Sequence, residues 1–173
     1  MAVEFQDFSI EVIGEMEDKA IQWLYEAAGE LEAQTKRNLD KEGSSWFSQQ
    51  KTAWRYEVDE GRLEATVGNP QERSLWTEFG TGEYSISPKG GRRGYWIYVK
   101  EADGEAGAGS TYVYKGGKAY TLDEAKRLVA MMREDGLDAR YTRGQQPRKP
   151  FQTAYTKLKP KLIKRAEQIF KGV

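Results

Sequence analysis

The chain has 173 residues, of which 38% are hydrophobic and 12% aromatic, and its 27 basic and 27 acidic residues cancel. This length and apolar content suit one domain with its own core and exclude a disordered tail. The sequence contains no cysteine and no histidine, so thiol chemistry, imidazole catalysis and nearly all zinc, copper and haem sites are excluded. No apolar run approaches the roughly 20 residues that span a bilayer, and the first residues lack the basic start of a signal peptide. We therefore expect a protein that is not an enzyme, with no catalytic residues, no metal, no cofactor and no membrane partner.

The neutral total conceals a charge gradient along the chain. Residues 1–60 hold 6 basic and 14 acidic residues, residues 61–138 hold 11 and 12, and residues 139–173 hold 10 and 1. The acidic and basic ends can neutralise each other within one molecule, or join neighbouring subunits head to tail. The basic end can also lie against nucleic acid. The sequence leaves these three interpretations open.

Apolar residues at helical spacing predict a long first helix, from residue 8 or 10 to residue 37. Its stripe consists of Ile13, Met16, Ala20, Leu24, Ala27 and Leu31. Such a stripe is more typical of a core-facing surface than of a groove for a partner. After a polar connector, period-two alternation predicts a hairpin with strands at residues 52–58 and 63–68. Asn69-Pro70 ends this hairpin and opens a short turn or helix through Leu75, Trp76 and Phe79.

The middle of the chain is predicted to hold a glycine-rich loop, two strands, a short helix and another strand. The loop covers residues 80–94, and the strands cover residues 95–99, 111–114 and 139–142. Thr121 and Glu124 have the spacing of a capping box at the start of the short helix, and Gly136 suits its C-terminal end.

The last predicted helix follows Pro147 and Pro150, and Pro160 inside it is expected to kink or interrupt it. Its apolar stripe consists of Phe151, Ala154, Leu158, Leu162, Ala166 and Ile169. Together the elements predict an α+β fold in a single domain, residues 1–173. One antiparallel sheet of about four to five strands is expected to pack against the long N-terminal and C-terminal helices. A strand-helix-strand segment, at about 111–142, is inserted into this arrangement.

Motifs that carry chemistry are scarce. The acidic turn at residues 101–105 lacks the spacing of a calcium loop, and the glycine-rich segments complete no phosphate-binding pattern. The best nucleic-acid candidate is a group of aromatic residues beside Arg92 and Arg93, since aromatic rings stack on bases while arginines hold phosphates. These aromatic residues are Tyr95, Trp96 and Tyr98. An ordinary buried strand behind a basic loop is the commoner explanation of this pattern.

Two segments resemble a known family. Residues 75–82, L-W-T-E-F-G-T-G, resemble the aromatic-x-E-F-G-T-G signature of the tail-component family of lambdoid phages. Residues 144–151, G-Q-Q-P-R-K-P-F, resemble the family's G-x-x-P-R-P-F segment, with Lys149 as an extra residue. The order of elements also agrees over most of the chain. The residues that carry the resemblance are Trp76, Glu78, Phe79, Gly80, Thr81, Gly82, Gly144, Pro147, Arg148, Pro150 and Phe151.

The resemblance implies a structural virion protein of a tailed phage or prophage, assembled in the host cytoplasm. It implies a ring with six-fold or twelve-fold symmetry in the neck, which joins head to tail or completes the tail around the DNA channel. Its partners are then other copies of the chain, the adjoining neck, connector and tail proteins, and genomic DNA passing through the channel. A tail terminator that caps the tail tube is the alternative within this class, and a stand-alone nucleic-acid-binding module is the alternative outside it.

The motif residues also have expected physical roles. Gly80 and Gly82 permit a sharp turn that lets Phe79 point inward. Pro147 and Pro150 stiffen the approach to the last helix, and Phe151 anchors this helix in the core. A second expectation concerns the basic residues of the glycine-rich loop, which we expect to contact the DNA channel or an adjoining neck protein. These residues are Lys89, Arg92 and Arg93.

Overall fold

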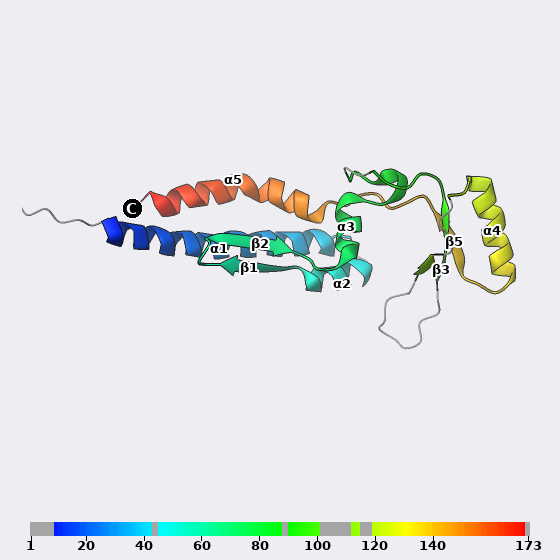
Figure 1. Ribbon diagram of the computed structural model, residues 1–173, viewed down its shortest axis with the longest axis horizontal. Coiled ribbons are helices and arrows are strands. Elements are labelled where there is room, and N and C mark those ends of the chain that lie inside the picture. Colours follow the sequence, from blue (N-terminus) through cyan, green and yellow to red (C-terminus); the bar gives the residue numbers. More distant parts are fainter. Residues whose placement is uncertain (1–8, 43–44, 88–89, 101–111, 115–118, 172–173) are drawn as a thin grey trace, which may run out of the picture. The chain divides into compact units, whose positions relative to one another are not determined.

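The computed structural model describes residues 9–42, 45–87, 90–100, 112–114 and 119–171 (Figure 1). The chain forms two compact units, where the sequence predicted one domain. Met1–Gln71 and Pro150–Val173 make up the first, which we call the helical unit, and Glu72–Lys149 make up the second, the sheet unit. The sheet unit is thus inserted between the two sequence segments of the helical unit.

The helical unit contains three helices and one hairpin among its described residues. They are α1 (Ser9–Asp40), α2 (Ser45–Ala53), β1 (Arg55–Asp59), β2 (Glu64–Gly68) and α5 (Pro150–Phe170). α5 lies antiparallel along α1, and the hairpin also packs on α1 (Figure 1). The predicted first helix is confirmed and continues slightly beyond its expected end. The strands pair antiparallel from Arg55 opposite Gly68 to Asp59 opposite Glu64, which confirms the predicted hairpin.

The core of the helical unit lies where α1, α2, the hairpin and the start of α5 meet. Leu39, Phe47 and Trp54 are buried together, and Val67 and Phe151 pack against them. The rings of Trp54 and Phe151 are stacked, with centroids 5.5 Å apart and an interplanar angle of 8°. Phe151 therefore anchors α5 in the core, as its place in the sequence motif predicted.

Two local expectations in this unit were wrong. Thr52 and Ala53 belong to α2 and not to the first strand. Phe47 and Gln50, three residues apart, are both buried, which is the spacing of one helix face. Tertiary packing therefore favours a helix that continues through Thr52 and Ala53, and the strand begins only after Trp54. The second is that Pro160 would interrupt the last helix, whereas α5 continues through this residue. Pro160 is exposed, so water can solvate the carbonyl group that lacks its usual donor.

The sheet unit contains a three-stranded antiparallel sheet and two α-helices among its described residues. They are α3 (Glu72–Phe79), the short 3₁₀ helix η1 (Gly82–Tyr84), β3 (Trp96–Lys100), β4 (Tyr112–Tyr114), α4 (Leu122–Glu134) and β5 (Ala139–Thr142). The strand order is β4-β3-β5. α4 covers one face of the sheet, where Val129 is buried with Ile97, Val99 and Ala139. The predicted inserted strand-helix-strand segment thus supplies β4, α4 and β5 of this unit.

The predicted capping box at the start of α4 is confirmed. The backbone N–H of Thr121 donates to Glu124 Oε2 at 2.8 Å, and the backbone N–H of Glu124 donates to Thr121 Oγ1 at 3.4 Å. Gly136, just beyond the helix, has a φ of 81°, the left-handed conformation expected there.

The α+β class and the two long terminal helices are confirmed. The five described strands, however, form two separate antiparallel sheets of two and three strands, and not a single sheet. Asn69-Pro70 ends β2, and both edges of β3 are occupied by β4 and β5. Among the described residues, the strands of the hairpin therefore pair only with each other and pack on α1, while α4 covers one face of the second sheet.

Candidate functional site

The two motif segments that carry the family resemblance contact each other directly. The backbone N–H of Thr81 donates to the carbonyl oxygen of Gln145 at 2.9 Å, and the backbone N–H of Gln145 donates to Thr81 Oγ1 at 2.9 Å. The backbone N–H of Glu83 donates to the carbonyl oxygen of Arg143 at 3.0 Å, and that of Arg148 donates to Thr77 at 2.8 Å. We call residues 77–83 and 143–149, joined by these bonds, the motif junction.

Glycine is required in the motif junction because the two backbones approach closely. Gly82 has a φ of 60°, and a Cβ there would overlap the carbonyl oxygen of Arg143 and the ring of Trp96. Gly144 has a φ of 130°, and a Cβ there would overlap the carbonyl oxygen of Thr81. Any larger residue at these positions would push the two segments apart.

The aromatic residues of the first motif do not point inward. Phe79 is 40% exposed and Trp76 is 42% exposed, while Ser74 and Thr77 are the buried residues of α3. The expectation that Gly80 lets Phe79 turn inward is therefore wrong. Gly80 instead packs against Pro147 of the second motif, whose backbone nitrogen lies 2.9 Å from the Cβ position of Gly80. The turn at Gly80 therefore allows the backbones of the two motif segments to approach each other closely. Glu78, between the two aromatic residues, is half-buried.

The second motif crosses from one unit to the other. Gly144 to Lys149 belong to the sheet unit, whereas Pro150 and Phe151 begin the helical segment. Lys149, the residue that is extra relative to the family pattern, has a φ of 54°, an uncommon conformation for a residue with a side chain. The side-chain amide of Asn38 donates to the carbonyl oxygen of Pro150 at 2.9 Å and fixes the first turn of α5 on α1.

Arg143 forms a charged cluster within the motif junction, and the sequence analysis did not single it out. Its guanidinium lies 5.1 Å from the ring centroid of Tyr84 and 3.7 Å from Glu83 Oε2. Glu83 Oε1 also accepts a hydrogen bond from the backbone N–H of Gly94 at 3.1 Å. The pKa of Arg143 is raised, chiefly by Tyr84 and less by Glu83, so this residue remains a cation. The sequence signal for Arg143 is its position directly before Gly144, the first residue of the second motif.

The predicted basic contact group is only partly described. Lys89 lies outside the described residues. Arg92 is half-buried, and its guanidinium lies 5.8 Å from the ring centroid of Trp96. Arg93 is exposed. Arg92 and Arg93 therefore have different surroundings, with Arg92 packed on an aromatic side chain of the sheet unit.

The three aromatic residues of the nucleic-acid candidate do not share one surface. Trp96 and Tyr98 alternate along β3 with Ile97 and Val99, which are buried against α4, so they lie on the opposite face of the sheet. Tyr95 instead makes an edge contact with Tyr141, with ring centroids 5.7 Å apart. No single stacking platform of all three residues is formed.

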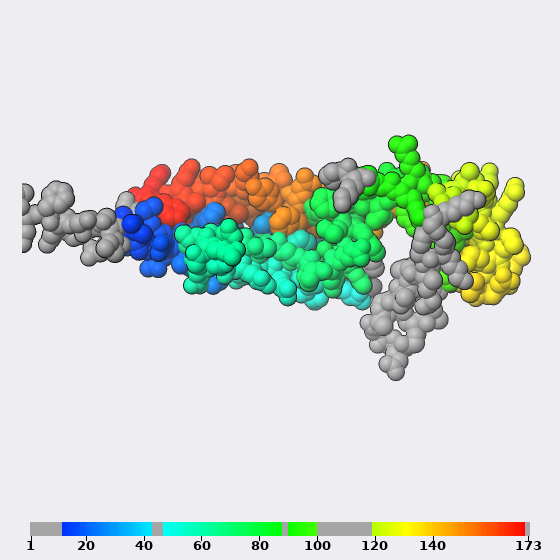
Figure 2. All heavy atoms as spheres, viewed as in Figure 1, coloured from blue at the N-terminus to red at the C-terminus, as the bar shows by residue number. Residues whose placement is uncertain are grey.

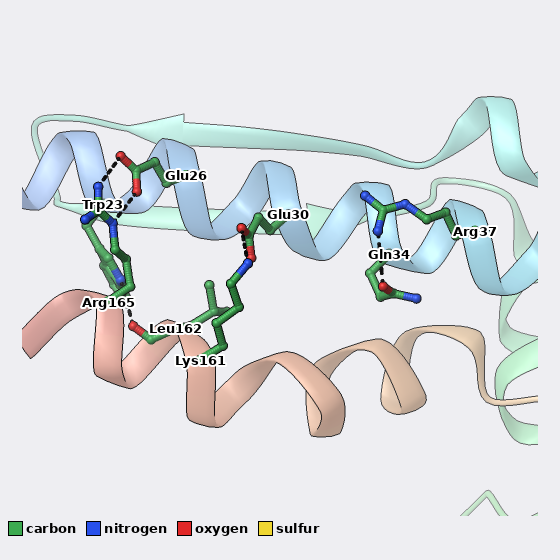
Figure 3. Close-up of polar contacts among 8 residues, drawn as sticks. All are labelled: Trp23, Glu26, Glu30, Gln34, Arg37, Lys161, Leu162 and Arg165. Carbon is green, nitrogen blue, oxygen red and sulfur yellow. Dashed lines mark hydrogen bonds and ion pairs between the residues drawn. The ribbon is translucent and has the colours of Figure 1, made fainter.

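The acidic and basic ends of the chain meet within one molecule. Glu30 of α1 pairs with Lys161 of α5 at 2.7 Å, and Glu26 pairs with Arg165 at 3.0 Å (Figure 3). One turn before Glu26 on α1, Trp23 Nε1 also donates to α5, to the carbonyl oxygen of Leu162 at 3.2 Å. The hydrogen bond from Arg165 lowers the pKa of Glu26 below its ordinary value, and Gln22 adds a second one. Neutralisation within the molecule thus accounts for part of the charge gradient.

The described part of the chain contains no cluster of three or more acidic, histidine or cysteine side chains able to hold a metal ion. None of its helices is long and apolar enough to cross a membrane. Comparison with protein-family models, curated proteins and solved structures finds no match to this chain.

Proposed function

We propose that this chain is a structural protein of a tailed phage or prophage, which forms a ring in the neck and takes part in head–tail joining or tail completion. The observation that carries the proposal is the motif junction. Thr81 and Gln145 lie 64 positions apart in the sequence, yet they are directly hydrogen-bonded. The two segments on which the family resemblance rests therefore act as one structural element.

The contacts of the motif junction are of a kind that holds two backbone segments rigidly together. Its bonds are mainly backbone to backbone, and its glycines serve close approach. Such bonds keep a fold in shape and need no substrate. This construction supports a role in assembly, in which complementary surfaces recognise each other without turnover.

The basic residues of the glycine-rich loop, Lys89, Arg92 and Arg93, supply the proposed contact with DNA in the channel or with an adjoining neck protein. We add Arg143 to this group, because it is an exposed residue of the motif junction. Exposed arginines suit phosphate groups and carboxylates, which they can bind through two parallel hydrogen bonds.

The proposal is tested first by electron microscopy and light scattering of the purified chain. Rings with six or twelve copies are expected. Finding these rings at the head–tail junction of the particle would support the proposed position in the neck. A chain that stays monomeric at every concentration, or a junction without a copy of it, would contradict the proposal. A position at the end of the tail tube would instead identify a tail terminator.

The basic contact group is tested separately, by replacing Lys89, Arg92 and Arg93 with alanine. Head–tail joining should be impaired while the fold is unchanged. Replacement of the exposed Lys126 and Arg127 of α4 with alanine is the matched control. Normal joining by the triple variant would show that the loop makes no such contact. Sub-micromolar binding of free DNA at moderate salt would favour the nucleic-acid-binding module instead.

A further inference from the structure

The last helix keeps an excess of positive charge after its ion pairs with α1 are counted. Residues 150–171 hold five lysines and one arginine against one acidic residue, Glu167. Lys161 pairs with Glu30 of α1, and Arg165 pairs with Glu26 (Figure 3). The other four lysines have no acidic partner in the described part of the chain, so contact with α1 neutralises only part of the charge of this helix.

Three of these four lysines form a row along one side of the helix. Lys157, Lys164 and Lys171 are exposed and follow each other at intervals of seven residues, and a step of seven residues returns to within about 20° of the same direction. The backbone N–H of Lys171 donates to the carbonyl oxygen of Glu167 at 3.1 Å, which continues the helical bonding to this residue. At a rise of about 1.5 Å per residue the row spans about 21 Å. We call these three residues the lysine row.

The surroundings of the lysine row are polar and exposed. Thr153 and Gln168, each four residues from a lysine of the row, continue its side of the helix and are exposed. α5 packs against α1 and forms one edge of the helical unit in Figure 2. The exposed apolar side chains of α5, Tyr155 and Ile163, lie on a different side, about 100° or more around the helix from the nearest lysine of the row.

This composition favours a nucleic acid over a protein as the partner of the lysine row. The cores of protein–protein interfaces are rich in aromatic residues and poor in lysine, whereas the row and its neighbours contribute lysine, threonine and glutamine. Lysine ammonium groups bind phosphates as point charges and read no base. Duplex DNA carries one negative charge per about 1.7 Å of its axis, so many phosphates lie within the length of the row.

We propose that the lysine row binds the phosphate backbone of double-stranded DNA, independently of its sequence. The inference rests on the proposed neck position and assigns the side of the helical unit that faces the DNA in the channel. Three phosphate contacts give a weak interaction, with a dissociation constant in the micromolar range or above at physiological salt. Weak contact that reads no base suits DNA that has to move past the protein.

Fluorescence anisotropy with a labelled DNA duplex of mixed sequence tests the lysine row. Each phosphate contact contributes about −0.9 to the slope of log affinity against log salt, so three contacts give a slope of about −2.7 for each bound copy. The affinity should then fall about 40-fold between about 50 mM and 200 mM salt. The variant K157Q/K164Q/K171Q should bind at least about tenfold more weakly at the lower salt concentration, with a much flatter slope.

The matched control removes the same charge from other surfaces. K41Q/K126Q/K159Q replaces three exposed lysines outside the row and should bind DNA like the wild type. Glu167 borders the row, three residues after Lys164 and four before Lys171, so E167Q should bind DNA more tightly. Circular dichroism checks that each variant is folded.

The outcomes separate this inference from the proposed function. Equal affinities of the row variant and its control, or no binding by the wild type at low salt, would overturn the assignment of the lysine row. Competition by poly-glutamate as strong as that by unlabelled duplex would overturn it in favour of an acidic protein partner. Rings at the head–tail junction would still support the neck role in each of these cases, whereas a chain that forms no ring contradicts the neck role whatever its affinity for DNA.

Discussion

Thr81 and Gln145 exchange hydrogen bonds, with the Thr81 N–H donating to the Gln145 carbonyl oxygen and the Gln145 N–H donating to Thr81 Oγ1, both at 2.9 Å. One side-chain oxygen therefore holds a segment that lies 64 positions further along the chain. This pair explains why a threonine between two glycines matters to the fold.

Thr81→Val should destabilise the sheet unit. Valine keeps the branched shape but leaves the Gln145 N–H without its acceptor, at an expected cost of about 1–3 kcal/mol in the free energy of unfolding. Urea denaturation followed by circular dichroism measures the change. Thr81→Ser, which keeps the hydroxyl group, should be much closer to the wild type. Equal losses in the two variants would show that the hydroxyl oxygen contributes nothing.

Gly82→Ala should be more damaging than Gly136→Ala. Both glycines have positive φ, 60° and 81°, so alanine is strained by about 1 kcal/mol or more at either position. Nothing lies within 4 Å of a Cβ at Gly136, whereas a Cβ at Gly82 overlaps Arg143 and Trp96. Thermal unfolding of the two variants separates backbone strain from steric overlap. Similar melting temperatures would mean that the close approach in the motif junction is not needed.

Phe151→Ala should destabilise the helical unit by about 3 kcal/mol, because it removes the ring that stacks on Trp54 and opens a cavity in the core. Phe151→Leu retains most of the apolar volume and should lose only the aromatic contact, about 0.5–1.5 kcal/mol. Urea denaturation measures both values. If both variants were as stable as the wild type, contacts other than the stacking of Phe151 on Trp54 would fix the start of α5.

The Glu26–Arg165 pair should stabilise the fold in a pH-dependent way. Because the pKa of Glu26 in the folded chain is below its ordinary value of 4.5, the folded state binds fewer protons there than the unfolded state does. The stabilisation is thus fully present above about pH 4.5 and is lost as the pH falls through the lowered pKa.

Glu26→Gln removes this titration, so its melting temperature should lie below that of the wild type near neutral pH and approach it in acid. Thermal unfolding over a pH series measures the difference. Glu17→Gln, at an exposed position without a partner in the described chain, is the control. A difference that stayed constant with pH would contradict the assigned role of the pair.

Most of the local structure follows from patterns among residues that are close in the sequence. The periodicity of α1, the capping box of Thr121 and Glu124 and the alternation in β1 are encoded by neighbouring residues, so they could be predicted without the fold. The role of Phe151 also followed from its position, since a large aromatic residue beside a proline at the start of an apolar helix is suited to a core.

Four features depend instead on contacts between distant segments: the separation into two sheets, the helix α2, the exposure of Phe79 and the contact between the two motifs. Each depends on which distant segments pair, and pairing depends on steric fit and burial, which spacing along the chain does not encode. Thr81 and Gln145 show this most clearly, because neither residue type indicates a partner 64 positions away. Short-range patterns therefore predict helices and strands, whereas the contacts between distant residues depend on how the whole chain folds.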